Sequence, residues 1–300
     1  MGTAAVRTFH HREFPAARLA VAKDGRFVSL CIPARDEATT IGAIVETVRR
    51  ELVDRVPLLD EVLVVDDGST DATATVAADA GATVVATADV LPGSGPGQGK
   101  GEALWKAVAA SKGELLAFCD ADLRDFDPAF VTGVLGPLLT DASVVFVKGF
   151  YHRTFAGAPG EGGRVTELVA RPVLALLFPH LASVAQPLAG EFAGRRSVLE
   201  QVPFVHGYGV DLGLLIDVTA RCSAEAVAQV DLGTRTHRNR PLAELGPQAV
   251  AVLATALGRA GVAVSPDPPM ALRPRDGDPV ETDTADRPPM ASLPAYRDRA

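Results

Sequence analysis

Two carboxylates with a single residue between them end an apolar segment: Asp120 and Asp122 follow residues 115–119. A short, bounded apolar run of this kind is typical of a buried strand in a parallel sheet. Side chains two positions apart on a strand share a face, so both carboxylates can face one ligand. Two unit charges ~4 Å apart repel by roughly 4 kcal/mol at an effective dielectric constant of ~20. A divalent cation offsets that cost, and hard oxygen ligands suit Mg²⁺ or Mn²⁺. The pattern indicates a metal–diphosphate site, and the competing interpretation is a solvated acidic loop.

The elements that must position this pair alternate between strands and helices. Apolar runs predict strands at 27–32, 61–67, 82–86 and 115–119, and helical spacing predicts helices that start near residue 39, after residue 71 and at residue 102. Ser69 or Thr70 is the candidate cap of the second helix. This order predicts an α/β fold with a mostly parallel sheet and right-handed crossovers. The strand ends at Pro33, Asp66 and Asp120 then lie along one edge, where open α/β sheets bind ligands.

A glycine- and proline-rich loop over residues 91–101 carries Lys100 into the third helix. A lysine on such a loop can hold a diphosphate, although the spacing is not that of the P-loop. The competing interpretation is a mobile connection between a strand and a helix.

The second half of the chain offers a candidate anion site and a candidate metal ligand. Arg164 follows Gly163 at the start of a predicted helix, whose free N–H groups favour phosphate or carboxylate; an ordinary capped helix is the alternative. His237 lies past a predicted strand at 226–232 and could complete a metal site or remain solvated. The remaining elements are predicted as helices at 128–139, 195–201, 212–221 and 242–260 and a strand at 144–148.

Bulk composition narrows the class of protein. With 47% hydrophobic and 22% charged residues, the 300-residue chain suits one large globular domain or two small ones. The net charge of −8 provides no field that would draw nucleic acid or an anionic membrane, so an anionic ligand needs local basic groups. The three cysteines lie in apolar runs, which favours buried thiols in a reducing compartment. We find no transmembrane span and no signal peptide, and therefore expect a cytoplasmic protein.

Three motifs in order resemble the nucleotide-binding half of family 2-like glycosyltransferases with the GT-A fold. They are Pro-Ala-Arg-Asp-Glu at 33–37, Val-Asp-Asp-Gly-Ser-Thr-Asp at 65–71 and Asp-Ala-Asp at 120–122. Longer strings are similar to actinobacterial glucosyl-3-phosphoglycerate synthases, at 96–105, 162–172, 186–188, 207–210 and 237–242. The similarity spans roughly residues 27–260.

The resemblance implies a retaining enzyme that moves glucose from UDP-glucose to the 2-hydroxyl of 3-phosphoglycerate, requires Mg²⁺ (or Mn²⁺) and forms a homodimer. It divides the chain into a nucleotide-sugar-binding half at 26–150 and a half at 151–262 that binds the acceptor and completes the metal site. Residues 1–25 are weakly patterned and are expected to be an N-terminal arm or a short helix. The Pro- and charge-rich residues 263–300 are expected to be a disordered tail.

Residue roles follow from the resemblance at matching positions. The UDP-sugar would be held by Pro33, Ala34, Glu37, Asp67, Lys100, Asp120, Ala121 and Tyr208. The acceptor would be held by Gly163, Arg164, Thr166 and Asn239, and the metal by Asp122 and His237. Asp211, Leu188 and Arg235 would act around the reacting sugar.

Two positions depart from the family pattern. Ala121 stands where serine is usual, which removes a hydrogen bond and leaves the metal ligands in place. Asp211 stands where glutamate is usual and is one methylene shorter, so the hexose preference stays open. The alternatives are mannosyl transfer to the same acceptor, transfer to a polyprenyl phosphate, and a non-catalytic nucleotide-sugar-binding protein. The lack of a membrane segment counts against the second, and the joint retention of Lys100, both acids and His237 counts against the third.

Overall fold

A mixed but mostly parallel sheet organises the molecule. The computed structural model describes residues 6–95, 97, 99–155, 158–159, 163–236, 242–263, 271–272 and 278–297. Within them the sheet order is β1 (Arg7–His10), β10 (Val227–Thr236), β6 (Phe146–Phe155), β8 (Phe192–Arg195), β5 (Leu115–Phe118), β2 (Val28–Ala34), β3 (Glu61–Asp66) and β4 (Thr83–Ala86), with β7 (Ala158–Pro159) paired to β6. Strand β8 runs antiparallel to both its neighbours, and the pairs on either side of it are parallel. The predicted fold class is confirmed.

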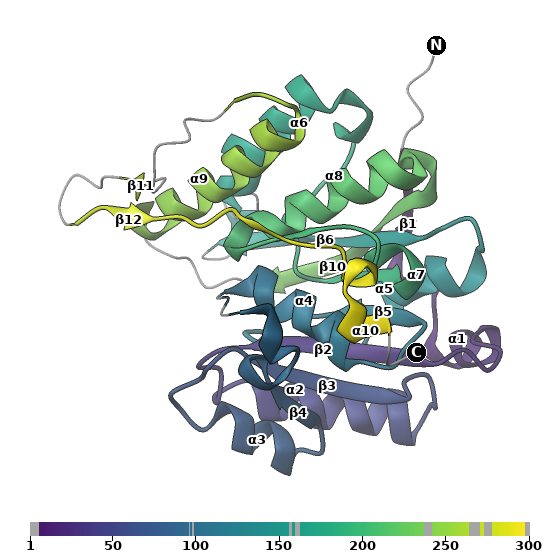
Figure 1. Ribbon diagram of the computed structural model, residues 1–300. Helices are drawn as coiled ribbons and strands as arrows, with labels where there is room; N and C mark the ends of the chain where they lie inside the picture. The colour runs from purple at the N-terminus through teal and green to yellow at the C-terminus, as the bar shows by residue number, and fades with distance from the viewer. Residues whose placement is uncertain are drawn as a thin grey trace.

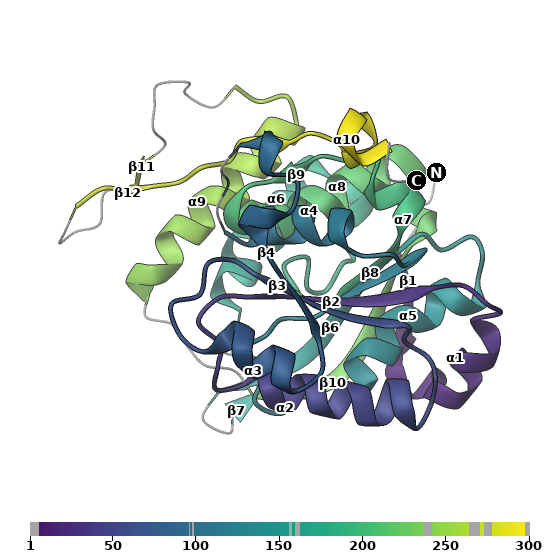
Figure 2. The same ribbon diagram turned by 60° about the horizontal axis from the view of Figure 1, so that its bottom comes forward.

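Helices cover both faces of this sheet (Figures 1 and 2). On one face lie α4 (Lys100–Ala110), α6 (Arg171–Leu177), α8 (Val210–Cys222) and α9 (Leu242–Arg259). On the other lie α1 (Ala16–Ala22), α2 (Ile41–Val48), α3 (Thr73–Asp79) and α5 (Ala129–Thr140). Because successive side chains of a strand face opposite sides, β5 places Leu116 and Phe118 in the first core and Leu115 and Ala117 in the second. None of the described helices is both long and apolar enough to cross a membrane.

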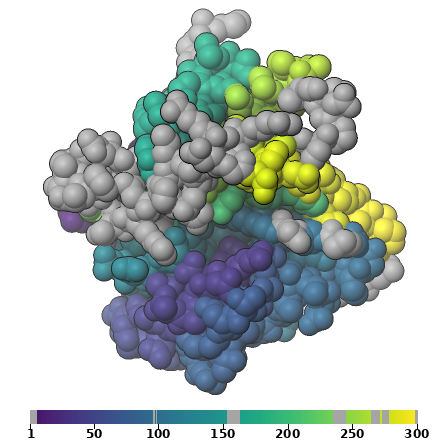
Figure 3. Space-filling view, turned by 90° about the vertical axis from the view of Figure 1, so that its left-hand side faces the viewer, coloured from purple at the N-terminus to yellow at the C-terminus, as the bar shows by residue number. Residues whose placement is uncertain are grey.

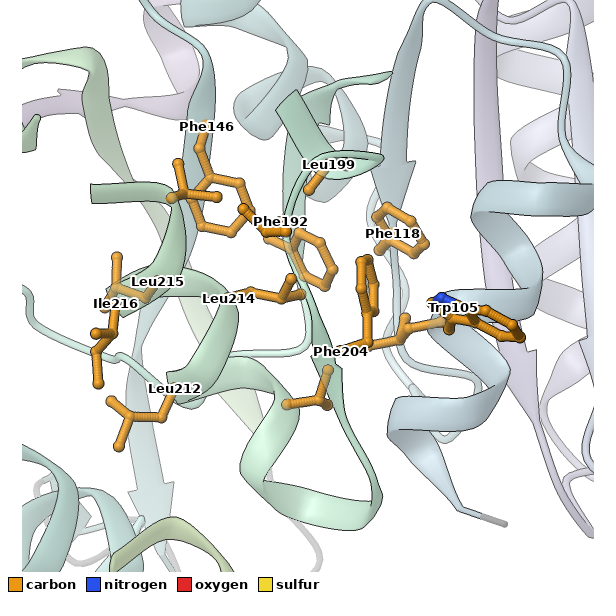
Figure 4. Close-up of a cluster of buried hydrophobic side chains, with 14 of the residues drawn as sticks. Trp105, Phe118, Phe146, Phe192, Leu199, Phe204, Leu212, Leu214, Leu215 and Ile216 are labelled. Carbon is orange, nitrogen blue, oxygen red and sulfur yellow. The ribbon is translucent and has the colours of Figure 1, made fainter. Parts of the chain in front are cut away.

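Aromatic side chains fill the core between the sheet and α4 and α8. The rings of Phe118 and Phe192 stack with their centroids 4.4 Å apart, and the ring of Phe146 lies 5.5 Å from that of Phe192. Trp105 from α4 and Phe204 complete the cluster, and all five side chains are buried (Figure 4). Full burial of one such side chain contributes about 1.5–3 kcal/mol. This core fixes α4 and α8, the two helices that carry Lys100 and Asp211.

The N-terminal residues form part of the fold: they contain the short helix that was one expectation, and the other expectation, a separate arm, is wrong. Strand β1 pairs in parallel with β10 and becomes an edge strand of the sheet. Helix α1 packs against α5, with Leu19 1% exposed and Phe14 6% exposed. The local sequence pattern of these residues is weak, since contacts with distant segments stabilise β1 and α1. The pattern alone therefore did not predict their place in the fold.

The C-terminal residues 278–297 are ordered as well, so the expectation of a disordered tail is wrong for them. They include β12 (Val280–Glu281), β13 (Asp286–Arg287) and α10 (Pro294–Arg297), and β12 pairs with β11 (Ala271–Leu272). Strand β13 pairs antiparallel with β9 (Phe204–Val205), and Met290 is fully buried in the core. This segment is ordered despite its many prolines and charged residues, because β13 pairs with β9 and Met290 packs in the core.

Candidate active site

The carboxyl ends of β2, β3 and β5 meet at one edge of the sheet, as their parallel pairing requires. The loops that follow them face a cavity of about 870 Å³. The cavity is lined by all eight predicted UDP-sugar residues and by one predicted metal ligand: Pro33, Ala34, Glu37, Asp67, Lys100, Asp120, Ala121, Tyr208 and Asp122. Residues far apart in the sequence therefore meet at one site, and their individual binding roles stay predictions.

Interlocking hydrogen bonds hold the loop after β2 against the loop after β3. The backbone N–H of Asp36 donates to Ser69 Oγ at 3.0 Å, and that of Thr70 donates to Asp36 Oδ1 at 2.7 Å. The N–H of Glu37 donates to Thr73 Oγ1 at 2.8 Å. The prediction that Ser69 or Thr70 caps the next helix is wrong, because α3 begins only at Thr73 and both residues bond to Asp36 instead.

Asp67 lies where the loop after β3 meets the glycine-rich loop. Its Oδ2 accepts a hydrogen bond from the backbone N–H of Gly99 at 3.0 Å, and Arg35 Nη1 lies 4.0 Å away. Burial raises the pKa of Asp67, and the Gly99 N–H and the Arg35 charge offset only part of that rise. Because a carboxylate is a pure acceptor only when ionised, the raised pKa widens the pH range in which Asp67 can also act as a donor.

Lys100 is held from two sides in the first turn of α4. Its Nζ lies 3.1 Å from Asp120 Oδ1 and 3.0 Å from Asp211 Oδ2. Burial alone would lower the pKa of Lys100, but the two carboxylates outweigh burial and hold the pKa above its usual value. The lysine is therefore an ammonium ion fixed at the cavity wall. Gly99 adopts φ 83° immediately before it, a left-handed conformation that glycine reaches without strain.

Asp211 is buried behind this lysine, in the first turn of α8. It is 4% exposed, and its Oδ1 lies 3.3 Å from Nζ of Lys148, which is itself 1% exposed. Lys148 Nζ also donates to the carbonyl oxygen of Ala189 at 2.5 Å. Burial lowers the pKa of Lys148, against the opposing effect of Asp211. Sequence reasoning missed Lys148; the available signal was a lysine that continues the apolar run 144–147, since a charge on a buried strand needs a partner.

The backbone around Leu188 passes close to the first carboxylate of the Asp-Ala-Asp motif. A Cβ atom at Gly190 would overlap the carboxyl group of Asp120, so a larger residue there would displace that side chain. The side chain of Leu188 packs against the apolar core. The loop that carries the predicted sugar-cation contact therefore lies next to the donor site.

The predicted acceptor residues lie in a separate segment. Gly163 has φ 80°, and its carbonyl accepts from the N–H of Glu167 at 2.9 Å. Arg164 opens the helix, and buried Thr166 begins the π-helical turn Thr166–Ala170, which packs against α9. The turn Gly207–Gly209, which contains Tyr208, also packs against α9. Helix α9 therefore contacts the segment that carries the predicted acceptor residues, and its residues Pro247 and Ala251 line the cavity.

The side chains of three predicted site residues are not described in the structure. His237 and Asn239 lie outside the described residues. Arg235 is on β10, where its backbone pairs with that of Arg153 on β6, and its side chain is not described.

The donor set suits a hard divalent cation. Asp122 lines the cavity and offers carboxylate oxygens, the ligands that Mg²⁺ and Mn²⁺ prefer. In the described part of the chain no group of three or more His, Cys, Asp or Glu side chains could hold a metal. A Mg²⁺ site of one or two carboxylates that takes its other ligands from water and substrate phosphates does not need such a group.

Several wall residues were not predicted. They are Arg35, Gly97, Gly99, Ala103, His206, Gly207, Pro247, Ala251 and the C-terminal residues Val280, Glu281, Thr282 and Asp283. For His206 the glycine-punctuated loop 203–211 was a usable signal, whereas the C-terminal residues carried none.

The mostly parallel sheet and the cavity at the carboxyl ends of its strands fit a glycosyltransferase of the GT-A type, and sequence similarity establishes that class. The family model for glycosyl transferase family 2 matches residues 29–202. The glucosyl-3-phosphoglycerate synthase of Mycolicibacterium smegmatis is 47% identical over 297 residues, which cover 95% of this chain and 96% of that protein.

Two solved structures of the glucosyl-3-phosphoglycerate synthase of Mycobacterium tuberculosis are similar throughout. The complex with Mn²⁺, UDP-glucose and phosphoglyceric acid has a TM-score of 0.88 and 42% identity, covering 96% of this chain and 99% of that one. The complex with Mn²⁺, UDP and glucosyl-3-phosphoglycerate has a TM-score of 0.87 and 43% identity, covering 95% and 99%. The chain belongs to the glucosyl-3-phosphoglycerate synthase family.

Proposed function

We propose that this protein transfers glucose from UDP-glucose to the 2-hydroxyl of 3-phosphoglycerate with retention of the anomeric configuration. The observation that carries the proposal is the position of Lys100, whose ammonium pairs with Asp120 at the cavity wall and with buried Asp211. One fixed cation thus links the predicted diphosphate site to the predicted sugar site. Preorganised charge of this kind stabilises the negative charge that develops on a leaving group.

The residues at the end of β5 hold the donor's charged part. Asp122 and His237 hold the divalent cation, Mg²⁺ or Mn²⁺, which when bound neutralises the leaving diphosphate. Lys100 supplies a second positive charge there. Replacement of Asp122 by alanine then abolishes metal-dependent turnover, and a steady-state assay with and without a chelator measures this; unchanged activity would remove the metal assignment.

The surroundings of Asp211 support a front-face reaction without a protein nucleophile. Oδ2 faces Lys100 and Oδ1 faces Lys148, so neither oxygen is poised to attack a sugar. In this mechanism the leaving β-phosphate takes the proton from the acceptor hydroxyl, and the backbone carbonyl of Leu188 helps to stabilise the sugar cation. Mass-spectrometric detection of a glycosyl adduct on Asp211 would contradict it.

The acceptor lies in the second half of the chain. The half at 26–150 supplies most of the predicted nucleotide-sugar residues, and the half at 151–262 supplies Tyr208 to that set and Gly163, Arg164, Thr166, Asn239 and Arg235 to the acceptor side. The guanidinium of Arg164 and the start of its helix suit a phosphate or carboxylate, and docking of that anion places the hydroxyl for attack.

A matrix of donors and acceptors tests the reaction. The purified protein is incubated with Mg²⁺ or Mn²⁺, with UDP-glucose, GDP-glucose or GDP-mannose, and with 3-phosphoglycerate, glycerol 3-phosphate or a polyprenyl phosphate. We expect mass spectrometry to find glucosyl-3-phosphoglycerate as the main product. A mannosyl product as the main product, or turnover only with the polyprenyl phosphate, would overturn the proposal.

Assembly and location complete the proposal. We infer a homodimer, as the family resemblance implies, which light scattering would report as twice the chain mass of 31.2 kDa. A cytoplasmic location agrees with the described cysteines, since none of Cys31, Cys119 and Cys222 forms a disulfide bond within the described residues. A monomeric mass at micromolar concentration would contradict the assembly.

A further inference from the structure

The C-terminal segment forms a wall of the nucleotide-sugar cavity. Residues 280–287, here called the strap, contribute Val280, Glu281, Thr282 and Asp283 to the cavity lining. In Figure 1 the yellow strap runs from β12 past α4 towards α10. In Figure 3 the yellow C-terminal segment lies between the blue segment that precedes and includes α4 and the green second half of the chain. The strap lies outside residues 29–202, the part of the chain that matches the family model.

Specific contacts hold the strap in this position. The N–H of His206 donates to the carbonyl oxygen of Ala285 at 2.9 Å, next to the pairing of β13 with β9. Arg259 binds both carboxylate oxygens of Asp286, at 2.8 and 2.9 Å. Just beyond the strap, Trp105 Nε1 donates to the carbonyl oxygen of Pro288 at 2.9 Å. Hydrogen bonds and an ion pair therefore hold this wall of the cavity in a defined position.

Arg287 connects the strap to the glycine-rich loop. Its guanidinium forms two bonds to Glu102, at 2.6 and 3.0 Å, and donates to the carbonyl oxygens of Ser94 at 2.6 Å and Gly95 at 3.1 Å. A Cβ atom at Gly97 would overlap both members of the Arg287–Glu102 pair, so the loop packs directly against them. Because this loop leads into Lys100, the strap and the lysine share one support.

Two polar atoms at this wall are buried and have no hydrogen-bond partner in the described part of the chain, Thr282 Oγ1 and His206 Nε2; Glu102 Oε2 lies 3.9 Å from Nε2, beyond hydrogen-bond distance. The other ring nitrogen of His206 lies 2.6 Å from Asp283 Oδ2, which fixes the ring orientation. Both residues line the cavity. Because buried polar atoms in native proteins almost always have a partner, these two indicate a bound polar group.

We propose that the strap is part of the donor site. The Thr282 hydroxyl and His206 Nε2 bind the nucleoside diphosphate, and Arg287 is a positioning residue that holds the strap and the glycine-rich loop together. The inference rests on the proposed function, since it needs a nucleotide sugar in this cavity. The donor is the ligand concerned because Asp67, Lys100 and Asp120 line the same cavity, whereas the acceptor segment at 163–166 does not.

Calorimetric titration of the Mn²⁺-loaded protein with UDP tests the direct contact. We expect Thr282→Val to bind UDP about 3–10-fold more weakly, the value of one hydrogen bond, and Thr282→Ser to bind like the wild type. The matched control Thr284→Val removes a neighbouring strap hydroxyl outside the lining and is expected to bind normally. Unchanged affinity of Thr282→Val, or an equal loss in Thr284→Val, would overturn the inference alone. A wild-type protein that does not bind UDP would overturn the proposed function with it.

Steady-state kinetics test the positioning role. Arg287→Met loses the forked contacts to the loop, so we expect the KM for UDP-glucose to rise about fivefold or more while the KM for 3-phosphoglycerate stays constant. Arg287→Lys keeps the charge and is expected to recover part of the loss. Arg297→Lys, at an exposed arginine of the same C-terminal segment, is the control. An equal rise in both KM values, or a lower melting temperature with unchanged kinetics, would contradict this role.

Discussion

The ammonium nitrogen of Lys100 lies 3.0 Å from Oδ2 of Asp211. The lysine begins α4, next to the glycine-rich loop, and the aspartate lies in the first turn of α8, so the contact joins two helices on the same face of the sheet. It spans the two halves assigned to donor and acceptor. We therefore expect a substitution of either residue to affect both the donor half and the acceptor half.

Replacement of Lys100 by methionine removes this link while it keeps most of the side-chain volume. Asp120 and Asp211 lose their shared cation, and the leaving diphosphate loses a fixed positive charge. Because one preorganised charge contributes roughly 10²–10³-fold in rate, we expect kcat to fall by about that factor. A coupled assay of UDP release measures the loss, and Lys112→Met, at an exposed lysine, is the control. A kcat within a few-fold of wild type would refute the role.

Replacement of Lys148 by methionine tests whether that residue acts by holding Asp211. Asp211 keeps Lys100 but loses its second anchor, so we expect kcat to fall about tenfold and the free energy of unfolding to fall by about 1–3 kcal/mol. Lys23 is a matched control, since it is also buried but pairs with Asp60, and neither residue lines the cavity. Lys23→Met is expected to lose stability with kcat retained. The same kcat in both variants would leave Lys148 with a structural role only.

The raised pKa of Asp67 predicts a pH dependence of donor binding. The ionised carboxylate accepts hydrogen bonds, and protonation on acidification removes that capacity. Because the pKa lies above its usual value, the loss begins at a higher pH than it would for an ordinary aspartate. Since the phosphates of UDP titrate too, the informative quantity is the ratio of UDP affinities of wild type and Asp67→Asn. We expect calorimetry to show this ratio falling as the pH decreases from neutral, and a constant ratio would contradict the assignment.

A change at Arg164 is expected to affect binding of the acceptor and not binding of the donor. Arg164→Ala removes a forked cation at the start of its helix, so we expect the KM for 3-phosphoglycerate to rise tenfold or more, about the value of one charge-assisted hydrogen bond, with the KM for UDP-glucose nearly constant. Arg171→Ala, at an exposed arginine of the next helix that pairs with Glu167, controls for the loss of a surface charge. Equal changes in both KM values would move the acceptor site elsewhere.

The sequence alone was sufficient to predict that the candidate donor-binding residues meet at one edge of the sheet. The apolar runs that became β2, β3 and β5 are local signals, and the rule that parallel strands present their carboxyl ends together then brought Pro33, Asp66 and Asp120 to one edge. Lys100 followed from its place at the end of a glycine-rich loop. These inferences required only periodicity and chain direction.

The remaining features depend on contacts between segments far apart in the sequence. Strand β1 exists because of its pairing with β10, and the strap stays in place because Arg287 finds Glu102 and Trp105. Lys148 is stable inside the protein because its ammonium contacts the carbonyl oxygen of Ala189 and the carboxylate of Asp211, 63 residues further along the chain. The two partners of each such pair lie far apart in the sequence. Local patterns therefore could not predict the ordered N- and C-terminal segments or the contact of Lys148 with Asp211.

The central claim is that Asp122, at the carboxyl end of the strand Leu115–Phe118, binds a divalent cation together with the diphosphate of the donor. A crystal grown with Mn²⁺ and UDP-glucose, with data collected at the manganese absorption edge, tests it most directly. We expect an anomalous peak within about 2.0–2.6 Å of a carboxylate oxygen of Asp122, bridging to the diphosphate. An anomalous peak or UDP density away from Asp120 and Asp122 would contradict the claim.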